Sequence, residues 1–224
     1  MRLAVISCTP RPAAKSNTAK IISVFLEGFS EKGGEAEVYY LADRKAWEAA
    51  RRAFYENDLV LFAMPLFVEA APGLFLEFLE GLAPKAYPEG AQRTKAAFLL
   101  QGGFAEASQL WCGESYLEQL PAYLNCDYAG TLIKGNMFGV SLVEGKARAG
   151  MLAPFRAMGA AFAEKGCFTK EEAAAFAGPA YFSKGFIFFF TLISPLQRLV
   201  FRQYAKKLGC RASLKARPYE TGRE

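Results

Sequence analysis

The chain has 224 residues, of which 52% are hydrophobic and 22% are charged, a composition typical of folded domains and unlike that of a disordered chain. The formal net charge is +5, a mild excess that fits an anionic small molecule, a nucleic acid or an acidic membrane surface equally well. Histidine is absent, which excludes the commonest general base and the commonest zinc ligand.

Five cysteines are scattered along the chain and never form a C-x-x-C pair: Cys8, Cys112, Cys126, Cys167 and Cys210. Their odd number and spacing predict neither a disulfide framework nor a metal site, and they favour reduced thiols in a cytoplasmic protein. The chain enters a strand-like run directly after Met1, without the long apolar region of a signal peptide. The longest apolar run near the end, 186–193, is far shorter than the about 20 residues that span a bilayer.

Strand patterns alternate with helix patterns along most of the chain. In chain order the sequence predicts strand 3–7, helix 16–32, strand 35–41, helix 43–56, strand 59–64, helix 72–82, strand 95–100, helix 106–124, strand 128–133, and helices 145–165 and 169–177. The alternation indicates right-handed crossovers and one doubly wound parallel sheet. The run 59–64 is wholly apolar, as expected of a central strand.

The composition shifts near Gly178-Pro179, where the chain becomes aromatic and then basic. We therefore expect a domain at 1–178 and a helical extension at 179–224, with a break or kink at Pro195. One interpretation is an amphipathic element that contacts a membrane surface or a partner subunit. The other is a terminal helix that packs on the sheet and leaves its basic side in solvent.

The loop 8–18 joins the first strand to the first helix. It combines hydroxyl groups, the guanidinium of Arg11 and a helix N-terminus, which together favour an anion such as a phosphate. The alternative is an ordinary helix cap by Ser16 after a turn. Neither the P-loop pattern nor the dinucleotide-binding glycine pattern occurs here.

Three segments together resemble a known family. The loop 8–18 resembles the G-S-P-R-x-x-S-x-T phosphate loop of the NAD(P)H-dependent FMN reductases, a flavodoxin-like superfamily. Segments 64–68, 71–73 and 78–80 are similar to the family's S-P-V-Y-W…M-P-G…F-I-D stretch, and 101–104 resembles its third flavin loop. The resemblance covers about residues 1–135. It implies a flavodoxin-like three-layer sandwich, with a five-stranded parallel sheet, helices on both faces and an extra C-terminal helical segment.

The resemblance also implies which residues hold FMN. The phosphate would be held by Thr9, Arg11, Ser16, Asn17 and Thr18. The ribityl chain and one edge of the isoalloxazine ring would lie along Pro65, Leu66, Phe67 and Val68. The other side of the ring would face Gln101, Gly102, Gly103 and Phe104. Taken singly, the two glycines also fit a turn that ends a strand, and the two phenylalanines also fit core positions.

Two departures from the family pattern matter. Cys8 stands where the family usually has glycine, and it is interpreted either as a redox-sensitive thiol near a helix N-terminus or as a small buried residue. Val68 stands where an aromatic side chain often covers the flavin.

The family resemblance implies an FMN-binding oxidoreductase that takes a hydride from NADH or NADPH and passes electrons to a small acceptor such as a quinone or free flavin. The flavin N5 atom would carry the chemistry, with no catalytic side chain and no metal. A homodimer is expected, and a peripheral membrane contact is one of the two interpretations of the C-terminal segment. A flavodoxin-like electron carrier and a non-catalytic flavin-binding or scaffold module are the alternatives. A nucleic-acid partner is not expected, because no recognised reading motif occurs.

Overall fold

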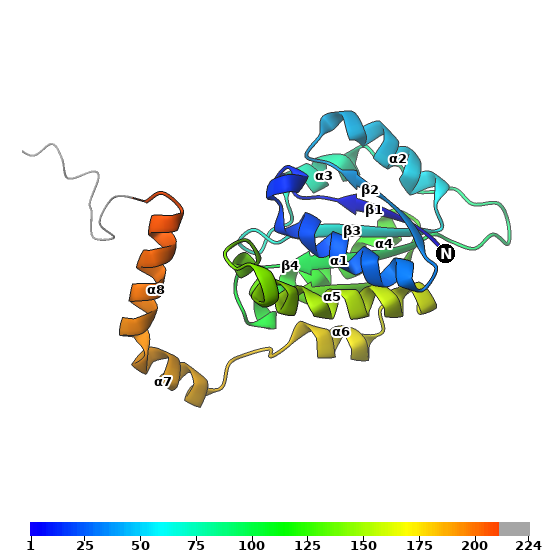
Figure 1. The fold of residues 1–224 in the computed structure, drawn as a ribbon. Helices are drawn as coiled ribbons and strands as arrows, with labels where there is room; N and C mark the ends of the chain where they lie inside the picture. Colours follow the sequence, from blue (N-terminus) through cyan, green and yellow to red (C-terminus); the bar gives the residue numbers. More distant parts are fainter. Residues whose placement is uncertain (211–224) are drawn as a thin grey trace, which may run out of the picture. The chain divides into compact units, whose positions relative to one another are not determined.

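Five parallel strands form one sheet in the order β2-β1-β3-β4-β5 in the computed structural model, which describes residues 1–210 (Figure 1). The strands are β1 (Arg2–Ser7), β2 (Glu35–Tyr40), β3 (Leu59–Pro65), β4 (Lys95–Gln101) and β5 (Asp127–Lys134). This is the doubly wound order of flavodoxin-like sheets, so the expected fold class is confirmed. Residues 211–224, the end of the expected extension, lie outside the described part of the chain.

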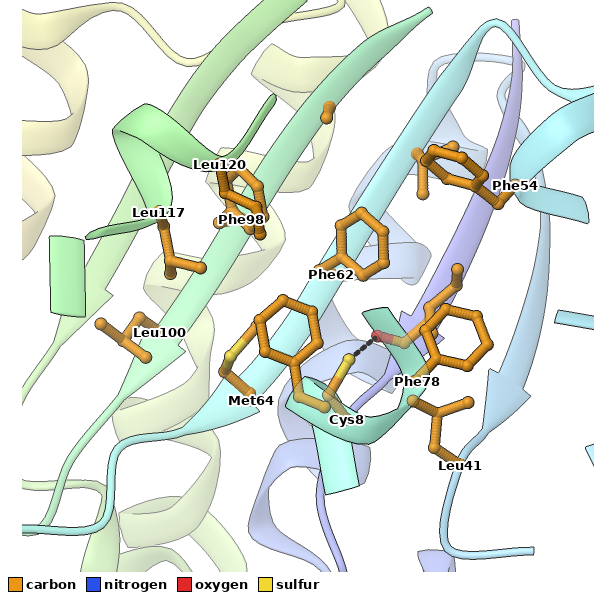
Figure 2. Close-up of a cluster of buried hydrophobic side chains, with 14 of the residues drawn as sticks. Cys8, Leu41, Phe54, Phe62, Met64, Phe78, Phe98, Leu100, Leu117 and Leu120 are labelled. Carbon is orange, nitrogen blue, oxygen red and sulfur yellow. Dashed lines mark hydrogen bonds between the residues drawn. The ribbon is translucent and has the colours of Figure 1, made fainter. Parts of the chain in front are cut away.

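Helices cover both faces of the sheet and make three layers. They are α1 (Asn17–Glu31), α2 (Trp47–Glu56), α3 (Gly73–Glu80), α4 (Trp111–Tyr123), α5 (Gly145–Lys165) and α6 (Lys170–Ala177). One face packs against α2, α3 and α4, and the other packs against α1, α5 and α6. Figure 2 shows the first of these layers, where Phe62 of β3 and Phe98 of β4 stack on each other among side chains of the covering helices.

The expected helices 43–56 and 106–124 are each divided. A short 3-10 turn precedes each α-helix: η2 (Arg44–Ala46) comes before α2, and η3 (Ala107–Leu110) comes before α4. In the first case Asp43 caps the turn, because its carboxylate accepts from the Lys45 N–H at 3.0 Å. In the second, the N–H groups of Ala107 and Ser108 donate to the carbonyls of residues 179 and 180, which holds η3 outside the helix.

The helix α1 begins at the carboxyl edge of β1. Ser16 is its N-cap, and the Ser16 hydroxyl oxygen accepts from the Ala19 N–H at 3.1 Å. Its buried face includes Ile21 and Phe25, as the spacing of apolar residues predicts. The sequence places a glycine pair after the helix, and Gly33 takes a positive φ of 76° that ends it. The start of α1 is therefore fixed close to the end of β1.

The chain folds as two compact units, Met1–Tyr181 and a second that begins at Phe182. The second unit contains α7 (Lys184–Leu192) and α8 (Ser194–Lys207). The break expected at Pro195 is confirmed, because α7 ends before Ile193 and Pro195 occupies the first turn of α8.

Candidate functional site

Three loops leave the carboxyl ends of β1, β3 and β4 and surround one cavity of about 210 Å³. Its lining residues are Thr9, Arg11, Ser16, Asn17, Thr18, Pro65, Leu66, Phe67, Gln101, Gly102, Gly103 and Phe138. A second cavity of about 130 Å³ shares three of these residues and adds Val68, Glu69, Phe104, Gln109 and Leu110. All thirteen predicted site residues therefore lie around these two cavities. Ligands of doubly wound sheets bind at this edge.

The start of α1 presents donors suited to an anion. The N–H groups of Asn17 and Thr18 donate to no partner within residues 1–210, as is usual for the first turn of a helix. Arg11 is exposed, and no salt bridge engages it in the described chain. The sequence contains no aspartate or glutamate before Glu27. Among residues 1–210 no carboxylate lines the 210 Å³ cavity, so Arg11 adds to the positive potential of the helix terminus there.

Two threonines of the first loop, Thr9 and Thr18, are buried. The Thr9 hydroxyl oxygen accepts from the Arg11 N–H at 3.3 Å, and the Thr18 hydroxyl oxygen accepts from the Gln101 side-chain amide at 3.4 Å. Each hydroxyl keeps its own hydrogen to donate. The contact between Thr18 and Gln101 also links the first loop to the third, across the end of the sheet.

The Asn17 side chain makes two hydrogen bonds within the protein. Its side-chain amide donates to the Met137 carbonyl oxygen at 2.9 Å and accepts from the Ser141 hydroxyl. The side chain therefore holds the segment η4 (Met137–Ser141), and the main-chain N–H of Asn17 is what it offers to a ligand. The reason is tertiary: η4 follows β5 and lies against the start of α1.

The same segment supplies a lining residue that the sequence analysis missed. Phe138 lies in η4, is exposed and reaches the larger of the two site cavities. Its position is fixed by main-chain bonds, since Asn136 N–H donates to Phe104 O at 2.7 Å and Met137 N–H donates to Gly102 O at 2.9 Å. The only signal available in the sequence was that this segment follows a parallel strand.

The loop after β3 makes a tight turn without glycine. The N–H of Phe67 donates to the Ala70 carbonyl at 2.9 Å, and Val68 and Glu69 have positive φ angles of 47° and 66°. Leu66 N–H is also engaged, by Gln101 O at 2.8 Å. Pro65 has no N–H, so the Val68 N–H is the one main-chain donor of 65–68 that has no hydrogen-bond partner within residues 1–210. The β-branched Val68 is 95% exposed in a strained conformation.

Apolar side chains cluster in solvent around the cavities. Phe67, Phe104 and Phe138 are all exposed, and Val68 projects beside them. The third loop has no room for a side chain at Gly102, because a Cβ there would come within 2.8 Å of Leu110. An exposed apolar group of this kind beside an anion-attracting helix terminus suits a flat ring that carries a phosphate.

A larger cavity, of about 370 Å³, lies elsewhere, between α4, the edge of β5 and α6. Two carboxylates of α4 line it, Glu114 and Glu118. Burial raises the pKa of Glu114, and the charge of Glu118 raises it further. Lys170 also lines this cavity, so its carboxylates outnumber its cations, whereas the lining of the 210 Å³ cavity within residues 1–210 includes Arg11 and no carboxylate. The 210 Å³ cavity is therefore the candidate phosphate site.

Cys8 is fully buried below the first loop. Its thiol donates to the Ile6 carbonyl at 3.3 Å (Figure 2), and burial raises the pKa of the thiol well above its ordinary value. A neutral, inaccessible thiol is unreactive. The structure therefore favours the small buried residue over the redox-sensitive thiol.

The sheet order together with these loops defines a flavodoxin-like α/β protein. No protein-family model matches the sequence, and no curated protein matches it. Solved structures match its fold. An FMN-dependent NADH-azoreductase from Bacillus anthracis, in complex with FMN, is 14% identical with a TM-score of 0.52, over 75% of this chain and 99% of that one.

Two further solved structures match the fold of this chain. An NAD(P)H:quinone oxidoreductase from Methanothermobacter marburgensis is 19% identical with a TM-score of 0.52, over 71% of this chain and 94% of that one. An NADPH-quinone reductase from P. pentosaceus is 16% identical with a TM-score of 0.50, over 71% and 98% of the two chains. At these identities the likeness shows a shared fold.

Proposed function

We propose that the chain is an NAD(P)H-dependent oxidoreductase whose domain 1–178 holds FMN without a covalent bond. The observation that carries the proposal is that the N-terminus of α1 and the exposed rings of Phe67 and Phe138 line one cavity at the carboxyl edge of the sheet. Three structural neighbours support it, because their names specify an NADH-azoreductase with FMN and two quinone reductases. NADH or NADPH would be the reductant, and a small molecule such as a quinone or free flavin would be the acceptor.

The first loop would hold the phosphate. Arg11 supplies a guanidinium fork, and the N–H groups of Asn17 and Thr18 supply donors along the helix axis. The hydroxyl groups of Thr9 and Ser16 lie in the same lining and add neutral donors. These residues fit a dianion because they bring several donors and no carboxylate.

The second and third loops would hold the ring. Phe67, Val68 and Phe104 provide apolar contact surface, with Phe138 beside them. Gly102 and Gly103 allow the main chain to approach a flat ligand closely. When bound, FMN supplies hydride chemistry at its N5 atom, so the protein's task is position and exclusion of water, and no catalytic side chain is proposed.

We also propose a cytoplasmic homodimer. Phe104 and Phe138 expose apolar surface at the rim of the site, which a second copy would cover. The cysteines at positions 8, 112, 126 and 167 are free thiols, which is typical of proteins in a reducing compartment.

The test is titration of the purified protein with FMN, followed by anaerobic mixing with NADH and NADPH. We expect Arg11→Ala to weaken FMN binding about tenfold to a hundredfold, because a hydrogen bond to a charged group contributes about 1.5–3 kcal/mol. Arg52→Ala is the matched control, since Arg52 is exposed on α2 and lies outside both site cavities. Unchanged affinity in Arg11→Ala would refute the phosphate site.

Bleaching of the flavin absorbance by either nucleotide would support the reductase. Binding of FMN without bleaching by either nucleotide, but with reduction by a partner protein, would refute the reductase and support a flavodoxin-like electron carrier. Failure to bind FMN would refute both and support a scaffold module.

A further inference from the structure

The segment 182–210 carries charge of one sign. It contains basic residues and no acidic ones, namely Lys184, Arg198, Arg202, Lys206 and Lys207. No aspartate or glutamate occurs between residues 173 and 219. A segment with this charge is attracted to anionic surfaces over distances of about one Debye length, roughly 8–10 Å.

The helix α7 has no polar face in its middle. Five consecutive apolar residues, 186–190, are each between 41% and 72% exposed. Ser183 caps the helix by accepting from the Phe186 N–H at 3.2 Å. The Phe186 ring stacks on that of Phe190 and contacts the tilted ring of Phe182, with centroids 5.2 and 4.5 Å away. A helix that is apolar all round requires an apolar environment on every side.

The helix α8 is amphipathic and basic. Arg198, Arg202 and Lys206 recur every four residues and share one face. Val200, Phe201 and Tyr204 lie between about 200° and 300° around the helix axis from Arg198. Lys207 lies about 180° from Arg198, at the edge of this apolar face. The side chains of Val200 and Phe201 are exposed. A basic polar face opposite an apolar face is the pattern of helices that lie in a membrane interface.

The two helices turn by 71° at their junction, so α7 and the part of α8 from Gln197 to Lys207 do not form one rod. The side-chain amide of Gln197 donates to the Phe190 carbonyl at 2.9 Å across this bend. Among the described residues no single helix is long and apolar enough to cross a membrane, and the bent pair satisfies that criterion only by length and composition. The nine residues of α7 measure about 14 Å, roughly half the hydrocarbon thickness.

We infer that α7 and α8 form a peripheral docking surface for a membrane that contains anionic lipid. The aromatic side chains of α7 enter the boundary between headgroups and acyl chains. This environment contacts a helix on several sides, whereas a flat protein surface covers only one. The apolar face of α8 lies in the same plane, and its basic face meets the lipid phosphates. The all-basic charge of the segment selects anionic over neutral lipid.

The test uses the full chain and flotation of vesicles, a readout that does not depend on flavin. One set of vesicles is phosphatidylcholine, and the other is phosphatidylcholine with phosphatidylglycerol in equal amounts. We expect binding to the mixed vesicles that weakens as salt is added, and little binding to the neutral ones.

Three variants separate the contributions. Phe188→Ser with Phe189→Ser should abolish binding to mixed vesicles. Arg198→Gln, Arg202→Gln and Lys206→Gln together should weaken it on the order of a hundredfold, because each basic side chain near an anionic surface contributes about fivefold. The matched control removes three exposed charges of the first unit, by Arg52→Gln, Lys146→Gln and Lys170→Gln, and should retain most of the binding.

Circular dichroism should show an unchanged first unit in all variants, because the substituted side chains lie outside its core. The proposal is overturned if mixed vesicles do not bind the chain, or if the control triple loses as much binding as the α8 triple. Resistance to extraction by alkaline carbonate would also overturn it, in favour of a helix pair inserted across the bilayer. Self-association without vesicle binding would overturn it in favour of a second copy.

Discussion

The side-chain amide of Asn17 donates to the Met137 carbonyl at 2.9 Å, and this bond ties the start of α1 to the segment after β5, 120 residues later in the chain. Together with the main-chain bonds that Asn136 and Met137 donate to the third loop, it holds Phe138 at the candidate site.

We predict that Asn17→Ala lowers the free energy of unfolding of the flavin-free protein by about 1–2 kcal/mol, because two hydrogen bonds are lost. Urea unfolding monitored by circular dichroism measures this change. Ser141→Ala removes one of these two bonds and also the exposed bond that Lys20 Nζ donates to the Ser141 hydroxyl at 3.1 Å, and it should cost no more than Asn17→Ala. If Asn17→Ala left the flavin-free protein unchanged and weakened FMN binding alone, the side chain would be a phosphate ligand.

Gly28 of α1 and Gly159 of α5 are needed for the close crossing of these helices. A Cβ on Gly28 would overlap the Arg156 carbonyl oxygen, and a Cβ on Gly159 would overlap the Phe25 carbonyl oxygen. Main-chain atoms cannot move aside without separating the helices. We expect Gly28→Ala to destabilise the fold by about 2–4 kcal/mol, as overpacking against a rigid partner does.

Gly150→Ala is the matched control for Gly28→Ala. Gly150 also lies in a helix, α5, but nothing in the described chain lies within 4 Å of a Cβ placed there. That variant should be stabilised by about 0.5–1 kcal/mol, because alanine favours helix more than glycine. Equal effects of the two substitutions on the urea midpoint would contradict the close crossing.

Val68 stores strain in the turn after β3. Its φ of 47° is unfavourable for a β-branched residue, and the side chain contributes little packing at 95% exposure. Val68→Gly should therefore raise the free energy of unfolding by about 1 kcal/mol. Val68→Ala keeps a Cβ and should gain less. A loss of stability in Val68→Gly would mean that the valine side chain packs against another part of the protein.

The buried thiol of Cys8 should resist alkylation. Iodoacetamide at about pH 8, near the ordinary thiol pKa, should label the exposed Cys112 in the native protein and leave Cys8 unmodified until urea is added. Mass spectrometry of peptides distinguishes the two sites. Rapid labelling of Cys8 in the native protein would show that the first loop opens.

The same thiol makes stability depend on pH. Burial raises the pKa of Cys8 in the folded state, so the thiol stays protonated there while the unfolded chain ionises above about pH 8.5. The stability that Cys8 contributes is complete below that pH and is lost as the pH rises toward the folded pKa, by about 1.4 kcal/mol per pH unit. Cys8→Ala should have a smaller alkaline loss than the wild type in urea unfolding at about pH 8 and about pH 10, which bracket the ordinary thiol pKa. Equal losses of unfolding free energy in the wild type and in Cys8→Ala would show that other groups cause the alkaline destabilisation.

Local patterns were sufficient to predict most elements of the first unit. The strand 59–64 is recognised because β3 is buried on both faces, and α1 because Ile21 and Phe25 repeat at helical spacing. The loops of the candidate site were also predictable, because the carboxyl ends of parallel strands meet at one edge. The 3-10 turns before α2 and α4 could not be predicted from local patterns. The first is capped by the Asp43 side chain, and the second donates hydrogen bonds to carbonyls about 70 residues away in the chain.

The amino-acid sequence by itself determined the alternation of strands and helices, the doubly wound sheet and the positions of the three loops, because burial periodicity and helix caps act between near neighbours. Only the tertiary structure decided where the Asn17 side chain points, that Phe138 joins the site and that Gly28 and Gly159 allow α1 and α5 to cross closely. These features depend on contacts between residues far apart in the chain, and such contacts leave no periodic signal in the sequence.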